Sequence, residues 1–194
     1  MDIIFVAASE SDAIEPIIRK AREHGIIVVA VDIESAGADL IITSDNLQAG
    51  YLSCQEMINN VTKGSTDGSA VVAIINGQPI SSVINRVRGC KQAIVEHPNI
   101  KLVSSSHNSS GTLSGGLESM TYLLLEYPEI EAVFTINDPA GLGAVVATKQ
   151  LNRQDVTIFS VDGSPDFLNQ INDPTTNFIA SAAQFPREMA RRAV

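Results

Sequence analysis

The sequence predicts an α/β fold made of two doubly wound parallel-sheet lobes, of which the first is incomplete. Short runs of apolar, mostly β-branched residues alternate with amphipathic segments along nearly the whole chain. The runs within 2–8, 26–31 and 71–75 are continuous in hydrophobicity, which is typical of strands buried on both faces of a parallel sheet. The amphipathic segments between the runs would form the helices that cover those faces.

Several helices have recognisable ends. Apolar residues recur at helical spacing within 11–23, and Gly25 ends that helix. Asp45 or Asn46 would cap a helix that runs to about residue 61, and Pro186 would occupy the first turn of the last helix. We expect the remaining strands within 102–104, 132–136, 156–161 and 178–182, and the remaining helices at 82–96, 113–125, 141–150 and 165–171.

The segment 33–44 interrupts this alternation. It holds a short apolar run at 40–42 but no clear strand–helix pattern, so we interpret it as a crossing between two lobes. The domains expected are a partial N-terminal lobe at 1–43, a C-terminal lobe at 44–184, and a helix at 185–194 that returns to the N-terminal lobe. Two strand–helix units are too few for an ordinary sheet. We therefore expect the chain either to form homo-oligomers through its exposed first lobe or to act as part of a longer protein.

The composition excludes several classes of protein. The 194 residues carry a formal net charge of −9 and only scattered basic residues, which is unsuited to nucleic acid. Arg187, Arg191 and Arg192 cluster near the C-terminus, and we interpret them as a solvated helix face. The apolar runs are too short to span a bilayer. The chain opens directly on a strand-like segment, so we expect it to lack a signal peptide.

Neither a metal nor a cofactor is expected. The three histidines are isolated, and the two cysteines lack metal-site spacing. We expect Cys54 and Cys90 to be small, buried, unbonded side chains, since the sequence alone does not show whether their Cα atoms come within about 7 Å. No glycine-rich phosphate motif and no nucleophile elbow is present in the sequence, so we expect no enzyme activity.

Polar residues follow almost every predicted strand. Ligands of open α/β sheets bind beyond the carboxyl ends of the strands, where these residues would meet. Each of them alone has a simpler explanation as a helix cap or turn residue. Together, carboxylates and carboxamides without a basic cluster suit a neutral ligand with many hydroxyls. The strand-end residues are Ser9, Asp32, Asn76, Gly77, Gln78, Asn137, Asp138, Asp162, Gly163 and Gln184.

Five segments resemble a known family. The stretch AVFTINDPAGLGA at 132–144 resembles a segment of ribose-type periplasmic binding proteins. The turns Asp-Gly-Ser-Pro at 162–165 and Ala-Gln-Phe-Pro at 183–186 are similar to turns of the same family. So are Ser-Asp-Asn at 44–46 and the Arg-x-x-Gly motif at 86–89. The five occur in the family's order over nearly the whole chain.

The resemblance implies a type I periplasmic binding protein that closes its two lobes on a small sugar and delivers it to an ABC transporter permease. It implies that the full-length parent is periplasmic and begins two strand–helix units earlier. It implies sugar contacts at Asp32, Arg86, Asn137, Asp162 and Gln184. Arg86 does not follow a predicted strand, so the rule that ligands bind beyond the strand ends (the strand-end rule) does not select it. It would donate paired hydrogen bonds to a ring oxygen and a hydroxyl.

Two departures from the family pattern concern the ligand. Ile33 stands where the family often has arginine, and 109–112 reads Ser-Ser-Gly-Thr where it often has an aromatic residue. These departures favour a polyol and argue against ribose itself. The alternative function is the effector-binding core of a lactose-repressor-type regulator, which would need a DNA-binding segment ahead of this core.

Overall fold

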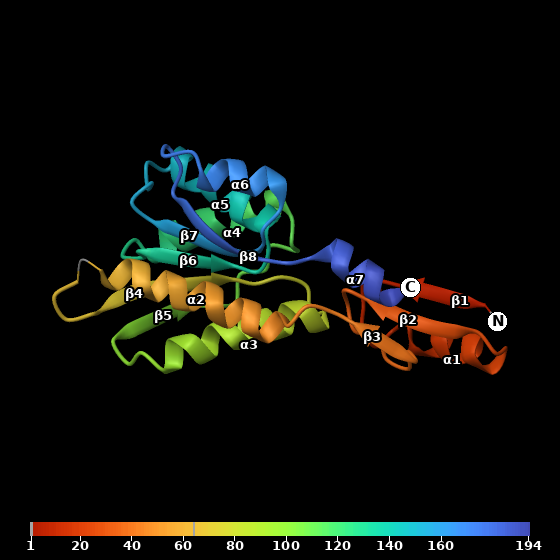
Figure 1. The fold of residues 1–194 in the computed structure, drawn as a ribbon. Helices are drawn as coiled ribbons and strands as arrows, with labels where there is room; N and C mark the ends of the chain where they lie inside the picture. The colour runs from red at the N-terminus through yellow and green to blue at the C-terminus, as the bar shows by residue number, and fades with distance from the viewer. Residues whose placement is uncertain (1, 64) are drawn as a thin grey trace.

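The computed structural model describes residues 2–63 and 65–194, and two parallel sheets organise the chain (Figure 1). The first sheet has the order β1-β2-β3, with β1 at Ile3–Val6, β2 at Ile27–Val31 and β3 at Leu40–Ile42. The second sheet has the order β5-β4-β6-β7-β8. Its strands are β4 (Ala70–Ile75), β5 (Ile100–Ser104), β6 (Ala132–Thr135), β7 (Thr157–Asp162) and β8 (Phe178–Ala183). Every strand pair is parallel, so the predicted fold class is confirmed.

Helices cover the second sheet on both faces. Buried side chains of α2 and α3 form one apolar cluster with β4, β6 and β7, and those of α4, α5 and α6 form another on the opposite face. The helix α7 packs instead against β2 and β3 of the first sheet. The helices are α1 (Glu15–Glu23), α2 (Asn46–Thr62), α3 (Ser81–Val95), α4 (Leu113–Glu126), α5 (Asp138–Gln150), α6 (Pro165–Ile171) and α7 (Pro186–Ala193).

Side-chain caps set the starts of three helices. The Asp45 carboxylate accepts a hydrogen bond from the Gln48 backbone N–H at 2.9 Å and caps α2, which decides between the two predicted caps. Thr112 caps α4 in the same way. The Asn137 side chain caps α5 by accepting from the Ala140 N–H at 3.1 Å. This helix therefore begins at Asp138, three residues earlier than the sequence predicts.

The segment 33–44 is more than a crossing, which corrects the sequence-based interpretation. Residues 40–42 form β3, which pairs with β2 so that Ile41 lies opposite Ala30. The backbone N–H of Asp39 donates to the Val28 carbonyl at 2.9 Å, and its carboxylate accepts from the Val28 N–H. Asp39 thus anchors a strand of only three residues, which is too short to show a periodic pattern.

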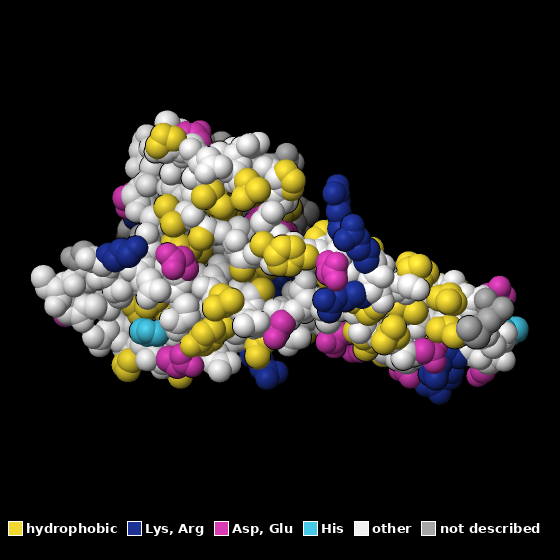
Figure 2. All heavy atoms as spheres, in the orientation of Figure 1, with side chains coloured by type: hydrophobic (Ala, Val, Ile, Leu, Met, Phe, Trp, Pro, Cys, Tyr) yellow, Lys and Arg dark blue, Asp and Glu magenta, His cyan; other side chains and the backbone are white. Residues whose placement is uncertain are grey.

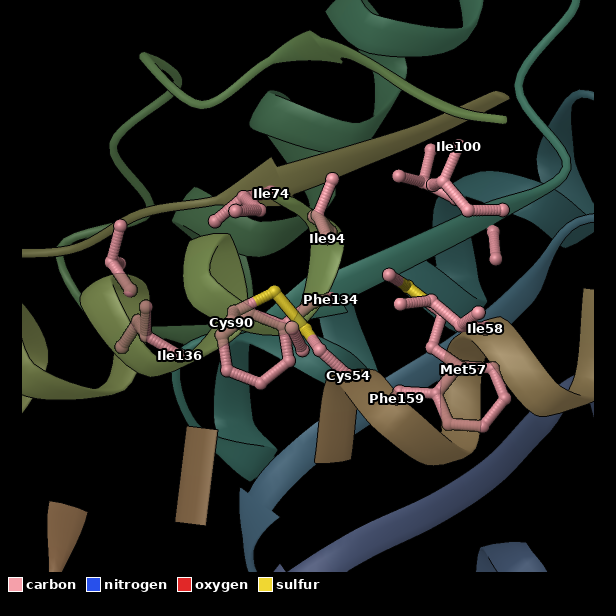
Figure 3. Close-up of a cluster of buried hydrophobic side chains, with 14 of the residues drawn as sticks. Cys54, Met57, Ile58, Ile74, Cys90, Ile94, Ile100, Phe134, Ile136 and Phe159 are labelled. Carbon is pink, nitrogen blue, oxygen red and sulfur yellow. A yellow bond between two sulfur atoms is a disulfide. The ribbon is translucent and has the colours of Figure 1, made fainter. Parts of the chain in front are cut away.

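The expectation of unbonded cysteines is also wrong. Cys54 of α2 and Cys90 of α3 form a disulfide, with Cα atoms 5.1 Å apart and both side chains fully buried (Figure 3). Two glycines explain how the helices come this close. A Cβ at Gly50 would collide with the backbone of Arg86, and one at Gly89 with that of Leu47. Sequence reasoning does not reveal this approach because it depends on tertiary packing.

Apolar side chains remain exposed on the first sheet (Figure 2). Phe5 of β1 is 48% exposed, and its neighbours Ile3 and Ile4 are exposed to a similar degree, as are Leu40 and Ile41 of β3. In β2 the consecutive residues 28–30 are buried, so that both faces of this middle strand are covered. Among the described residues, the helices are all too short or too polar to cross a membrane.

Candidate functional site

A cavity of ≈ 350 Å³ lies between the carboxyl ends of the two sheets. All five predicted site residues line it: Asp32, Arg86, Asn137, Asp162 and Gln184. Asp32 follows β2 of the first sheet, whereas the other four come from the second sheet and its connections. The remaining lining residues are Ser9, Ile33, Gln78, Ile80, Ser82, Val83, Ser110, Gly111 and Ile136. The strand-end rule and the resemblance therefore select residues that the fold brings together.

Arg86 forms the buried base of the site. It is only 5% exposed, and its Nε donates to the Asn46 side-chain oxygen at 2.9 Å. Its Nη1 donates to the Ile136 carbonyl at 2.8 Å and lies 3.2 Å from Asp162 Oδ1. Among the described residues, Nη2 has no hydrogen-bond partner. The protein thus holds Nε and Nη1 in place, and Nη2 is the group left for a ligand.

Asp162 stands at the end of β7 in a strained backbone conformation, with φ of 135°. Its Oδ1 accepts from Gln184 Nε2 at 2.7 Å. Gly163 follows with φ of 68°, and a Cβ there would lie 2.9 Å from the Cα of Ala183. Glycine is therefore required at position 163 for two reasons: its backbone lies close to β8, and its φ is positive.

Gln184 supplies an unsatisfied acceptor. Its side-chain oxygen, Oε1, is buried and has no hydrogen-bond partner among the described residues. A buried carbonyl of this kind ordinarily has a donor, because leaving it unpaired costs about 1–3 kcal/mol. A ligand hydroxyl could supply that donor, since the residue lines the cavity.

Asp32 brings a carboxylate from the first sheet. Its φ of 71° is left-handed, and the conformation is held by two backbone contacts to the end of β3. Its N–H donates to the Ile42 carbonyl at 2.9 Å, and its carbonyl accepts from the Thr43 hydroxyl at 2.7 Å. Burial raises the pKa of Asp32 above its ordinary value. Arg86 opposes that rise, and Asp162 adds to it.

Asn137 has the capping role that the sequence offers as the simpler explanation of each strand-end residue. Its oxygen caps α5, and its Nδ2 donates to the Gly111 carbonyl at 2.9 Å. Gly111 has φ of 68°, so this bond ties a tight turn into the cavity wall. One N–H of the carboxamide is left for a ligand.

Two supporting residues are absent from the five predicted sugar contacts, although Asp138 is among the strand-end residues. Asn46 orients Arg86, as described above. Asp138 is fully buried beside Asp162, where it accepts from the Ser181 hydroxyl at 2.5 Å and from the Ser164 N–H at 2.9 Å. Burial raises the pKa of Asp138, and these hydrogen bonds oppose the rise. The Ser-Asp-Asn and Asn-Asp motifs contain both residues, but their contacts appear only in three dimensions.

The site offers mostly hydrogen-bond acceptors around one guanidinium and has aliphatic walls. A second hollow of ≈ 770 Å³ shares Asp32, Asp162 and Gln184 and continues along α7. Among the described residues no group of His, Cys, Asp and Glu side chains has the arrangement of a metal site. The arrangement suits binding of a small polyhydroxylated molecule.

The chain is similar in sequence to known binding proteins for small polyhydroxylated molecules. The ribose import binding protein RbsB of Salmonella typhimurium is 27% identical over 194 residues, which cover 99% of this chain and 63% of the relative. The xylitol-binding protein of Mycolicibacterium smegmatis is 28% identical over 189 residues, covering 95% of this chain and 52% of the relative. The chain thus spans less than two thirds of the length of these curated relatives.

A solved structure matches closely in fold. An ABC transporter periplasmic solute binding protein from Actinobacillus succinogenes, with bound D-allose, has a TM-score of 0.87 and 26% identity, covering 100% of this chain and 69% of that one. The first sheet of three strands is consistent with a first lobe smaller than that of such relatives. The family described as "periplasmic binding protein domain" matches residues 1–194. The chain therefore belongs to the periplasmic binding protein domain family.

Proposed function

We propose that the chain binds a small neutral sugar or polyol between its two lobes and that the whole protein delivers this ligand to an ABC transporter permease. The observation that carries the proposal is a cavity lined by polar residues of both sheets, where the buried side-chain oxygen of Gln184 has no hydrogen-bond partner among the described residues. The relatives that bind ribose and xylitol, and the solved structure with bound D-allose, support the same ligand class. They are binding proteins, and we propose binding without catalysis for this chain.

The five residues would divide the recognition of hydroxyl groups. Asp32 and Asp162 would accept hydrogen bonds from hydroxyls, and so would Gln184 Oε1. Arg86 Nη2 and Asn137 Nδ2 would donate to ring or hydroxyl oxygens. A ligand that touches both Asp32 and the second sheet would stabilise the closed arrangement, because it gains contacts there that an open form lacks.

The domain division follows the same proposal. Residues 1–43 would form the part of the N-terminal lobe present here, 44–184 the C-terminal lobe, and 185–194 the return to the first lobe. The parent protein would be periplasmic. The exposed strands β1 and β3 would either pair with a second copy of the chain or be covered in a longer protein.

A thermal-shift screen against pentoses, hexoses, furanose sugars and alditols tests the function. At about 1 mM, a ligand with a dissociation constant near 10 µM adds roughly 2.7 kcal/mol of stability, a rise of several degrees in Tm. We expect a selective rise with one ligand that is lost in Asp32→Asn and kept in Glu118→Gln, which neutralises an exposed carboxylate outside the site. A cooperative melt without any shift across the panel would contradict the proposal.

A further inference from the structure

One contact outside the five proposed ligand contacts joins the two sides of the cavity. Ser81 is the first residue of α3 and belongs to the second-sheet side. Its hydroxyl oxygen accepts from the backbone N–H of Glu34 at 3.1 Å, and its own N–H donates to the Ser11 hydroxyl at 3.3 Å. Ser11 and Glu34 lie in the connections that follow β1 and β2 of the first sheet. A single residue therefore contacts two segments on the opposite side.

The contact satisfies one backbone N–H at the start of α3. The N-cap residue of α3 is Ile80, whose side chain makes no capping hydrogen bond. The first N–H groups of a helix have no partner within it, and a hydroxyl or carboxylate near the N-cap ordinarily supplies one. Here Ser11 supplies it from the other side of the cavity. The Ser81 N–H, the first of α3, thus has this partner only while the two sides are together.

The position of the contact links it to the cavity. Ile80 and Ser82, which flank Ser81, line the cavity, and so does Ile33, which precedes Glu34. The two first-sheet segments are tied to each other, because the Ala36 N–H donates to the Ser11 carbonyl at 2.9 Å. Any separation of the walls would break both hydrogen bonds of Ser81 at once.

We propose that Ser11 and Ser81 form a latch that holds the two walls of the cavity together in the closed form. In this role they are positioning residues: they act on the ligand through the closed arrangement and need not touch it. The effect of the latch on ligand affinity rests on the proposed binding of a sugar or polyol. The latch itself is a property of the chain without ligand, so the two can fail separately.

Amide hydrogen exchange on the chain without ligand tests the latch. We expect Ser81→Ala to speed exchange of the Glu34 amide about 3- to 10-fold, since its acceptor is removed. Ser11→Ala should do the same to the Ser81 amide, on the opposite side of the cavity. Ser114→Ala is the matched control, because its hydroxyl lies near the start of α4 and, among the described residues, its one hydrogen bond is with the Thr112 hydroxyl. Unchanged exchange of both reporter amides would overturn the latch.

Titration calorimetry and stopped-flow kinetics with the best alditol or sugar of the screen test its effect on binding. Ser81→Ala should weaken affinity about 3- to 10-fold, through faster dissociation, and Ser81→Thr, which keeps the hydroxyl, should restore it. Ser114→Ala should bind as the unmodified chain does. Affinity within twofold of the unmodified chain in both Ser81→Ala and Ser11→Ala would overturn the role in binding. If no member of the panel binds the unmodified chain, the proposed function fails, while the exchange data still decide the latch.

Discussion

The two sheets differ in how completely the chain covers them. In the second sheet, β4, β6 and β7 are almost entirely buried between helices on both faces. In the first sheet only β2 is buried, and the flanking strands β1 and β3 leave large apolar side chains in contact with solvent. By this measure the second sheet has its apolar core covered within the chain, whereas the first sheet leaves part of its apolar surface exposed.

This difference also divides the work of the site. The second sheet holds Arg86, Asp162 and Gln184 in a mutually bonded group, so that part of the cavity exists without the first sheet. The first sheet contributes Asp32, whose position depends on the short strand β3. The side chains of the second sheet should therefore already be in position before a ligand binds, whereas Asp32 of the first sheet should adjust its position on binding.

The largest effect is expected for Arg86→Ala. Removing this buried guanidinium takes the cation away from Asp162 and the Arg86 donors away from Asn46 and the Ile136 carbonyl, which should cost about 3–5 kcal/mol of unfolding free energy. Urea denaturation followed by circular dichroism measures it. A loss below about 1 kcal/mol would mean that the second sheet does not depend on this group.

The disulfide should contribute nearly as much. It closes a loop between residues 36 apart, so Cys54→Ala combined with Cys90→Ala should lower the unfolding free energy by about 3–4 kcal/mol. The comparison is calorimetric, with the unmodified oxidised chain as reference. Equal stability of the two proteins would show that the helix packing around Gly50 and Gly89 is sufficient without the bond.

A matched pair of isoleucine-to-alanine substitutions, one in each sheet, tests the comparison of the sheets directly. Ile74→Ala in β4 removes a fully buried side chain and should cost about 2–5 kcal/mol. Ile4→Ala in β1, where the side chain is 44% exposed, should cost less than about 1 kcal/mol. Denaturation midpoints of the two variants measure the difference. Similar losses would contradict the view that β1 is only partly covered.

The smallest effect on the free energy of unfolding is expected for Asp32→Asn. Burial raises the pKa of Asp32, so the folded chain holds that proton more tightly than the unfolded chain does. The resulting stability is present below the ordinary pKa of 3.8 and is lost as pH rises through the raised value. Asn also tolerates the left-handed conformation. The variant should therefore be as stable as the unmodified chain at pH 7, or more stable by less than about 1 kcal/mol, with any gain vanishing near pH 3. Thermal melts across pH measure it, and a marked loss at pH 7 would contradict this account.

The sequence predicts most of the fold because the second sheet is buried on both faces. Continuous apolar runs such as 71–75 and 132–136 have no other ordinary interpretation between amphipathic helices. The strand β3 escapes prediction because three residues show no periodicity, and its pairing depends on Asp39. The Cys54–Cys90 bond escapes because two glycines elsewhere in the helices set their distance.

The candidate site is predictable in its membership but not in its geometry. Four of its five residues lie at or just beyond strand ends, and the strand ends of parallel sheets meet at one edge. The capping role of Asn137, the orienting role of Asn46 and the unpaired oxygen of Gln184 depend on contacts between distant segments. No local pattern encodes these contacts.

The central claim is that one ligand lies between the two sheets and touches both. Mapping of backbone amide chemical shifts during titration with the best ligand of the screen tests it most directly. We predict saturable changes at Asp32 of the first sheet together with Asp162 and Gln184 of the second, at a single dissociation constant. Changes confined to one sheet, or centred on the groove between α2 and β8 that Leu52 and Phe185 line, would contradict the account.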